Sequence, residues 1–226
     1  MEIKSSIVDT SATAKTRWKI AQWFELRWWK RYLSGKNKQA YLQWKKQYWQ
    51  KILTSISSDV AIAPGAGVCD LGCGPAGIFI ALPTNRVTAV DPLIDEYERQ
   101  LSFFDKADYP YTTFVNSTIE DYKTDTKFEV VFCLNAINHV YHIENGFCKL
   151  NELAAANARV VVSIDAHNFS FFKYLFRLIP GDVLHPHQYD LAEYKQFIEK
   201  QQLKIVKTEL LKKEFFFTHY LLVAAK

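Results

Sequence analysis

The sequence predicts an α/β protein built on a doubly wound, mostly parallel sheet. Two observations lead to this class. From residue 67 onward, short apolar runs alternate with stretches of helical periodicity, the order that parallel strands with crossover helices require. The chain then ends in two apolar runs, 203–211 and 215–224, separated by three charged residues. Since so short a link joins neighbouring strands as a hairpin, we expect the last strand to be antiparallel.

The individual elements of this body follow from apolar runs bounded by glycine, proline and charged residues. Strands are expected near 67–71, 86–90, 111–115, 128–134 and 159–164. Helices are expected near 76–82, 93–105 and 145–156. Asp190 precedes a last amphipathic run, and aspartate is a favoured residue at a helix N-cap.

The N-terminal part of the chain differs from the body in composition. Two helices are expected there, 16–34 and 37–57. Residues 15–51 hold eleven Lys or Arg and one acid, a net charge of +10, together with all six tryptophans, whereas the rest of the chain carries −6. We therefore divide the chain into a basic, aromatic helical extension, 1–59, and a mildly acidic body, 60–226.

Cysteine use and the absence of targeting signals suggest a compartment. The four cysteines are scattered, without a metal-type C-x-x-C pair, and Cys69 and Cys133 fall inside expected strands. Free cysteines of this kind are typical of a reducing compartment. The first residues lack the order of a signal peptide, and no apolar run approaches the roughly 20 residues that a membrane helix needs. We expect a cytoplasmic protein, with peripheral contact to the inner face of a membrane left open.

The most informative motif is a glycine-rich turn directly after the first expected strand. Residues 68–77 read V-C-D-L-G-C-G-P-A-G, and three of their glycines have the G-x-G-x-x-G spacing of a dinucleotide site. Three details favour a different ligand. Asp70 lies two residues before the first glycine, Pro75 leaves little room for a pyrophosphate, and the second strand ends in Asp91 and Pro92.

The pattern D-L-G-C-G-P-x-G followed by V-D-P resembles that of the class I S-adenosylmethionine (SAM)-dependent methyltransferases. The resemblance covers 60–226 and implies a seven-stranded, Rossmann-like methyltransferase sheet with an antiparallel last strand. It implies that Asp70 and the glycines border the methionine end of SAM. It also implies that Asp91 holds the ribose hydroxyls, a role that suits a carboxylate because it can accept two hydrogen bonds from a diol.

Other segments at the carboxyl ends of the strands complete the cofactor site that this resemblance implies. The predicted cofactor residues are Asp70, Gly72, Cys73, Gly74, Gly77, Asp91, Pro92, Leu93, Thr118, Ile119, Glu120, Leu134 and Asn135. Two alternatives stay open. Asp91 can also cap a helix, because proline suits the first helical position, and Thr118 can simply cap a turn.

The segment after the fourth strand, 134–142, supplies the predicted catalytic residues. It is similar to the equivalent segment of ubiquinone-biosynthesis O-methyltransferases, which carry Glu-His-Val where this chain has Asn138, His139 and Val140. The amide in place of the acid weakens the case for a metal, and none is expected. His139 is a suitable general base for a hydroxyl, although it can instead support the loop. His142 is a weaker candidate for the same role.

The acceptor pocket is expected to form between the helical extension and the insertion after the fifth strand. The insertion, 169–180, is apolar and aromatic and is followed by a His-rich link. The predicted substrate-binding residues are Tyr41, Trp44, Tyr48, His185, His187 and Tyr189. The insertion could instead lie on a membrane surface or pack over the sheet edge. A metal pair at His185 and His187 is not expected, because no third ligand is evident.

Together these features predict a SAM-dependent methyltransferase that acts on a small, largely apolar, hydroxylated acceptor, with O-methylation favoured. The alternatives are N- or C-methylation, or a non-catalytic SAM-fold protein that binds a membrane or a partner through its N-terminal helices. For that extension we rank a lid over the site first, membrane contact second and nucleic-acid binding last. Nucleic acid is disfavoured by the acidic body and by the absence of an N-P-P-Y-like sequence after the fourth strand. Oligomeric state is left open.

Overall fold

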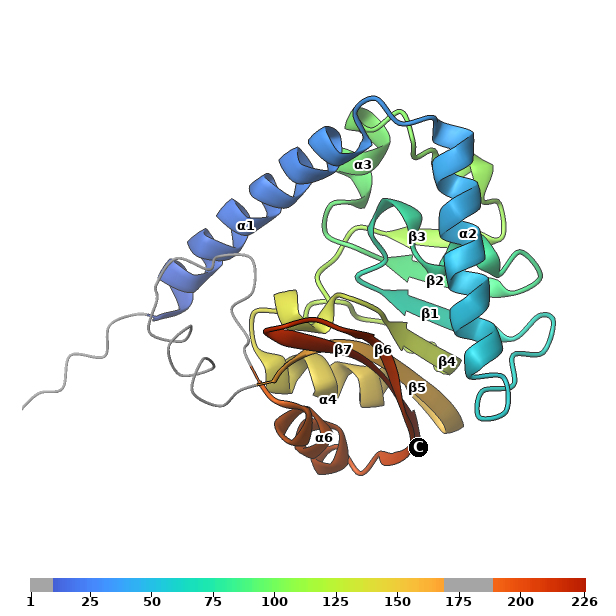
Figure 1. Cartoon of the computed structure of the whole chain (residues 1–226), viewed down its shortest axis with the longest axis vertical. Helices are drawn as coiled ribbons and strands as arrows, with labels where there is room; N and C mark the ends of the chain where they lie inside the picture. The colour runs from blue at the N-terminus through green and yellow to red at the C-terminus, as the bar shows by residue number, and fades with distance from the viewer. Residues whose placement is uncertain (1–9, 169–188) are drawn as a thin grey trace, which may run out of the picture.

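The body of the protein is built on one mixed seven-stranded sheet. The computed structural model describes residues 10–168 and 189–226, and the side chains from residue 22 onward within them. In this part of the chain the strands are β1 (Gly67–Leu71), β2 (Arg86–Val90), β3 (Thr112–Val115), β4 (Phe128–Cys133), β5 (Ala154–His167), β6 (Lys204–Lys213) and β7 (Phe217–Ala225). Their order is β3-β2-β1-β4-β5-β7-β6 (Figure 1).

The sheet has the predicted doubly wound topology. Strands β1 to β5 pair in parallel, whereas β7 is antiparallel to both β5 and β6. The chain moves outward from β1 to β3, and then returns to place β4 on the other side of β1. The topological switch point therefore lies between β1 and β4, where open α/β sheets bind their ligands beside the carboxyl ends of the strands. The predicted fold class is confirmed.

Helices cover both faces of the sheet. They are α1 (Thr10–Leu33), α2 (Lys38–Ser55), α3 (Ile94–Gln100), α4 (Ile143–Leu153) and α6 (Leu191–Lys200). Successive strand residues point to opposite faces. In β1, Val68 lies in the core formed with α2 and α3, and Cys69 lies in the core formed with α4 and α6. Helix α1 extends across the edge at which the parallel strands end (Figure 1).

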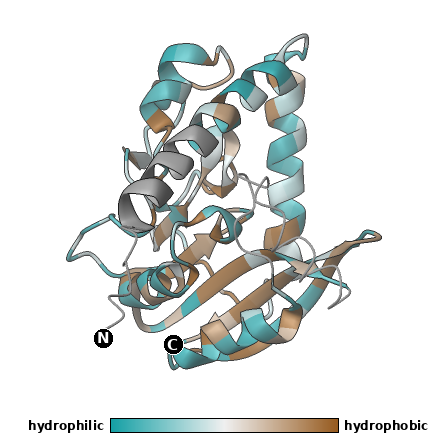
Figure 2. Ribbon diagram, turned by 90° about the vertical axis from the view of Figure 1, so that its left-hand side faces the viewer, coloured by the Kyte–Doolittle hydropathy of each residue, from teal (hydrophilic) through white to brown (hydrophobic). Residues whose placement is uncertain are grey.

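The two N-terminal helices are mostly hydrophilic, and α2 packs on the body through a few large side chains. Figure 2 shows strands mostly in the hydrophobic colour and α2 mostly in the hydrophilic and intermediate colours. In α2 the buried residues are Tyr41, Trp49 and Ile52, whereas Trp44 remains 51% exposed. Trp49 is fixed because its indole Nε1 donates to the carbonyl of Ala76 at 2.9 Å. Among the described residues, no helix combines the length and apolarity needed to cross a membrane.

One expected helix is wrong. Residues 76–82 do not form an α-helix; two short 3₁₀ helices, Gly74–Ala76 and Ile78–Ala81, occupy this region. The reason is local, because Gly77 between them is extended, with φ −71° and ψ −174°. Pro75 also lacks a backbone donor, which favours a helix start over continuation. Elsewhere, Asp190 is confirmed as an N-cap and forms a reciprocal capping box with Glu193.

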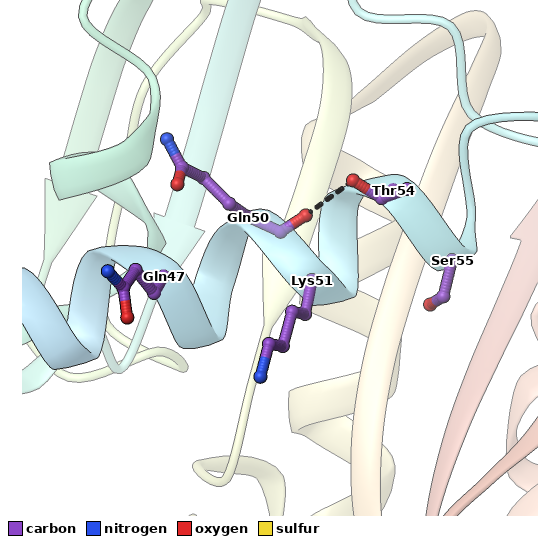
Figure 3. A pocket seen from close by; sticks show the side chains of 5 residues that line it. All are labelled: Gln47, Gln50, Lys51, Thr54 and Ser55. Carbon is purple, nitrogen blue, oxygen red and sulfur yellow. Dashed lines mark hydrogen bonds between the residues drawn. The ribbon is translucent and has the colours of Figure 1, made fainter.

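A surface hollow on α2 lies apart from the predicted site. Figure 3 shows its lining, which comes from α2 alone: Gln47, Gln50, Lys51, Thr54 and Ser55. The hydroxyl of Thr54 already donates to the carbonyl of Gln50 at 2.8 Å. Lys51 is the one titratable side chain among these lining residues, so we assign the hollow no ligand.

Candidate cofactor and acceptor site

The glycine-rich turn is held against the end of β2 by its own backbone. The N–H groups of Gly72 and Cys73 both donate to the carbonyl of Val90, at 2.8 and 3.2 Å. Gly72 has φ +67° and Gly74 φ +59°, values that glycine adopts without strain. A Cβ on Gly72 would lie 2.2 Å from the Cβ of Ala136. The turn therefore packs closely on the segment after β4 and leaves no space for a side chain at that position.

Asp91 links the end of β2 to this turn. Its Oδ2 accepts from the N–H of Gly74 at 2.9 Å, and its Oδ1 accepts from the N–H of Leu93 at 2.8 Å. The residue is 5% exposed. Burial and, after it, the nearby Glu25 carboxylate raise the pKa of Asp91 to about 7, against the opposing hydrogen bonds from the N–H groups of Leu93 and Gly74. An ionised carboxylate has about four acceptor positions, so two remain for the hydroxyls of a bound diol.

Asp70 lies beneath the turn. Its Oδ2 accepts from the N–H of Phe79 at 3.3 Å, and a Cβ on Gly77 would approach that oxygen to 2.4 Å. Burial raises the pKa of Asp70 to about 7, while the backbone N–H groups of Phe79 and Ile78 and the ammonium of Lys45 oppose the shift. The carboxyl group is thus placed to hold the turn in shape from below.

The segments after β3 and β4 meet at the same edge. Glu120 accepts from the N–H groups of Tyr141 and His142 at 2.6 and 3.1 Å, which ties the two loops together. Thr118 caps a turn through the N–H of Asp121 at 2.9 Å, the alternative that the sequence left open. Asn135 has φ +55° and its N–H donates to Ser163 at 2.7 Å. These segments therefore border one edge with the glycine turn.

The two predicted catalytic histidines lie in the loop after β4. His139 ends a short 3₁₀ helix, Ile137–His139, and is exposed. His142 is the exposed N-cap residue of α4. Asn138 is buried, and its Oδ1 accepts from the hydroxyl of Tyr194 in α6 at 2.8 Å. The amide that replaces the acid of the similar enzymes thus has a packing role between the loop and α6.

The predicted acceptor residues are only partly described. Tyr41 is buried against Phe103, with ring centroids 5.7 Å apart, whereas Trp44 and Tyr48 stack on one another at 6.3 Å. Tyr189 packs on Phe197 at 5.0 Å. His185 and His187 lie outside the described residues. The acceptor assignments therefore stay predictions.

The structure places two charged residues of the N-terminal helices at the site, and the sequence analysis identified neither of them. Glu25 of α1 accepts from the hydroxyl of Tyr97 at 3.3 Å, and burial raises its pKa. In α2, burial lowers the pKa of Lys45 to about 8 against the attraction of Asp70, and its ammonium lies 4.7 Å from the ring centroid of Trp49. Glu25 is the one acidic residue within 15–51, and this isolated position is the sequence signal that could have identified it.

Helix α1 covers the cofactor edge. The indole of Trp29 reaches the glycine turn, because a Cβ built on Gly74 would lie 3.7 Å from its Cζ2. Trp29 also packs edge-to-face on Tyr97 of α3, with centroids 6.5 Å apart. Within residues 10–168 and 189–226, no three His, Cys, Asp or Glu side chains gather closely enough to hold a metal ion.

The sheet order, the closed glycine turn and the acids at the ends of β1 and β2 define the fold of the class I SAM-dependent methyltransferases. Solved structures agree. The magnesium protoporphyrin IX methyltransferase of Synechocystis PCC 6803, crystallised with bound S-adenosylhomocysteine (SAH), superposes with a TM-score of 0.59 at 19% identity, covering 91% of this chain and 94% of its own. The N-methyltransferase NodS of Bradyrhizobium japonicum WM9, also with SAH, gives 0.58 at 11% identity, with coverages of 85% and 89%.

Sequence comparison points to one kind of enzyme within that fold. The chain is similar to the ubiquinone biosynthesis O-methyltransferase of Rickettsia typhi, with 26% identity over 145 residues. The alignment covers 63% of this chain and 58% of the relative, so it spans less than two thirds of that protein. No protein-family model matches the chain. The resemblance that the motifs indicated is thus confirmed at the level of fold and of related sequences.

Proposed function

We propose that the protein is a SAM-dependent methyltransferase that methylates a hydroxyl of a small, largely apolar acceptor. One observation carries the proposal: the buried carboxylate of Asp91, directly after β2, accepts from the N–H of Gly74 and keeps acceptor positions for a diol. The glycine-rich turn beside this acid has few side chains, so a nucleoside can approach its backbone closely. The similarity to ubiquinone biosynthesis O-methyltransferases supports the choice of reaction.

The residues around the turn have separate roles in this proposal. SAM, when bound, supplies a methyl group on a sulfonium that is already electrophilic. Asp91 accepts hydrogen bonds from the ribose, and Asp70 keeps the turn in place from below. The segments 117–120 and 134–135 border the nucleoside. The aromatic rings of α1 and α2 cover the site, where an aromatic face near a cation is favourable.

The acceptor is proposed to enter between the N-terminal helices and the ends of β4 and β5. The sequence assigns proton removal to His139, with His142 as the weaker candidate, and both lie at this edge. Trp23 and Trp28 of α1 are 54% and 52% exposed, which suits contact with an apolar acceptor or with a membrane surface carrying it. Peripheral membrane contact stays a prediction.

The experiment compares Asp91→Asn with Asp95→Asn. Asp95 is four residues further on, its side chain is half exposed, and it pairs with Lys106 at 2.7 Å, so it controls for loss of an acid nearby. We expect Asp91→Asn to weaken SAM binding at least about tenfold, because hydrogen bonds to a charged group contribute about 1.5–3 kcal/mol each. Asp95→Asn should bind SAM like the unaltered protein.

The second half of the experiment tests turnover. The unaltered protein is incubated with SAM and a panel of phenols, catechols and quinols, and SAH release is followed together with the methylated product. Transfer to a hydroxylated acceptor supports the proposal. Equal SAM affinity in both variants contradicts the ribose assignment, and transfer confined to amine acceptors contradicts O-methylation.

A further inference from the structure

A histidine and an aspartate that the cofactor site does not use face each other on neighbouring strands. The register of β5 and β7 places Asp165 directly opposite His219, and Nδ1 of the imidazole is in hydrogen-bond contact with Oδ1 of the carboxylate. Both side chains are about one-third exposed. A carboxylate on Nδ1 fixes the ring orientation and favours the tautomer that leaves Nε2 as a proton acceptor.

This pair lies on the cofactor's side of the sheet. Val68, Val161 and Leu221 belong to the core under α2 and α3. Because strand residues alternate between faces, Asp70, Asp165 and His219, each an even number of positions from one of them, share that face. Both members are near the carboxyl end of β5 and the start of antiparallel β7, and therefore at the edge where the glycine turn lies (Figure 1).

His219 lies further toward the carboxyl ends of the parallel strands than Asp70. β7 is three strands from β1, and the register places His219 four residues beyond the level of Asp70. With about 4.8 Å between strands and about 3.3 Å between residues, the two residues are about 20 Å apart. Burial and, after it, the Asp165 carboxylate raise the pKa of Tyr48 in α2.

The second ring nitrogen of His219, Nε2, is buried. Within the described part of the chain no group lies within hydrogen-bond distance of it, and Oε1 of Glu214 is 3.6 Å away. Buried polar atoms left in this state are uncommon and costly, and some are explained by catalytic roles. The hairpin tip is held in place, because Nδ2 of Asn168 donates to the carbonyls of Glu214 and Phe215 at 2.8 and 3.1 Å.

We propose that His219, oriented by Asp165, takes the proton from the acceptor hydroxyl; this inference rests on the proposed methyltransferase function. The hydroxyl oxygen forms a bond to the methyl carbon while the carbon–sulfur bond breaks, and that electron pair stays on sulfur. The proton moves from the hydroxyl to Nε2 of His219. The resulting imidazolium is stabilised by the Asp165 carboxylate and is deprotonated by solvent after product release.

Several charged or titratable groups face this imidazole. Asp165 comes from β5, Tyr48 from α2, and Lys212 from β6, where it lies opposite His219 in the register. Glu214 of the hairpin has Oε1 3.6 Å from Nε2 and pairs with Lys212.

The test compares His219→Gln with His139→Gln, the rival base, and with Tyr220→Phe, which alters the next residue of β7 on the opposite face. For His219→Gln we expect kcat/KM to fall between about 10²- and 10⁴-fold, while the SAM dissociation constant stays within twofold. His139→Gln should lose less than tenfold and Tyr220→Phe less than twofold. Added imidazole should partly restore turnover in His219→Ala, a readout that a packing defect would not give.

Acceptor acidity and the pH profile supply the second readout. In His219→Gln, acceptors with more acidic hydroxyls should lose less activity, and the rise of kcat/KM with pH should follow the acceptor's own ionisation. The inference is overturned if His219→Gln keeps turnover within threefold, or if the loss falls on His139→Gln instead. An unaltered protein that binds SAM but turns over no hydroxylated acceptor overturns the proposed function itself, and the inference with it.

Discussion

Replacing Asp70 by asparagine should stabilise the protein in a pH-dependent way. The carboxyl group is 2% exposed, accepts a hydrogen bond from the N–H of Phe79 at 3.3 Å, and has a pKa raised by burial to about 7. Asparagine keeps an acceptor oxygen of the same size and carries no charge at any pH. The substitution therefore removes the cost of ionising a buried acid with little change in packing.

The magnitude follows from the shift in pKa. In the folded protein the pKa of Asp70 is about 7, against 3.8 for an unperturbed aspartate. Between these values the folded state binds a proton that the unfolded state has lost, so stability falls as pH rises, and the loss is complete above about pH 7. Each unit corresponds to about 1.4 kcal/mol, so the stability difference between Asp70→Asn and the unaltered protein should grow by about 3 kcal/mol from pH 5 to pH 8.

The assay is urea unfolding at pH 5 and pH 8, followed by tryptophan fluorescence. Asp95→Asn is the control, because Lys106 and Asn116 lower the pKa of Asp95, and its stability difference should be flat above pH 5. Parallel pH profiles for Asp70→Asn and the unaltered protein, within about 1 kcal/mol, would refute the argument that burial governs this acid.

Three further predictions concern the turn and its acids. Burial and Glu25 raise the pKa of Asp91 to about 7, and the ribose hydroxyls need the ionised carboxylate. The affinity for SAM, measured by calorimetry, should therefore weaken as pH falls from 8 to 6, and an affinity that does not change with pH would contradict this. Gly72→Ala would place a Cβ 2.2 Å from the Cβ of Ala136 and should lower the free energy of unfolding in urea by several kcal/mol. Gly65 has φ +81° and nothing within 4 Å of a built Cβ, so Gly65→Ala should lose only about 1 kcal/mol through backbone strain. Similar losses in the two variants would contradict the steric explanation. Trp49→Phe removes the indole donor to the buried carbonyl of Ala76 and should cost about 1–3 kcal/mol, read as a lower melting temperature, and an unchanged melt would contradict it.

The strands of the sheet could be predicted well from the sequence because the signals for each strand are local in the chain. The bounds of β1 and β2 match the expected runs 67–71 and 86–90, since each run is mostly buried and ends at a glycine turn or an Asp-Pro pair. The closing hairpin was equally clear from its short charged link. The helix expected over 76–82 failed because helical periodicity does not register the extended backbone at Gly77.

The site could be predicted only where its residues are neighbours in the chain. Asp70 and Asp91 each stand beside their own strand, and both were found. The pairing of Asp165 with His219 depends on the register of two strands 54 residues apart, and the approach of Glu25 to Asp91 depends on where α1 crosses the edge. Such contacts are set by tertiary packing, which no periodicity or spacing in one sequence encodes.

The most direct test of the central claim is isothermal titration of the unaltered protein and of Asp91→Asn with SAM and with SAH. The account predicts micromolar binding of both ligands by the unaltered protein and at least about tenfold weaker binding by the variant. The absence of heat with the unaltered protein, together with an unchanged melting temperature, would contradict it and leave the glycine turn as a structural feature alone.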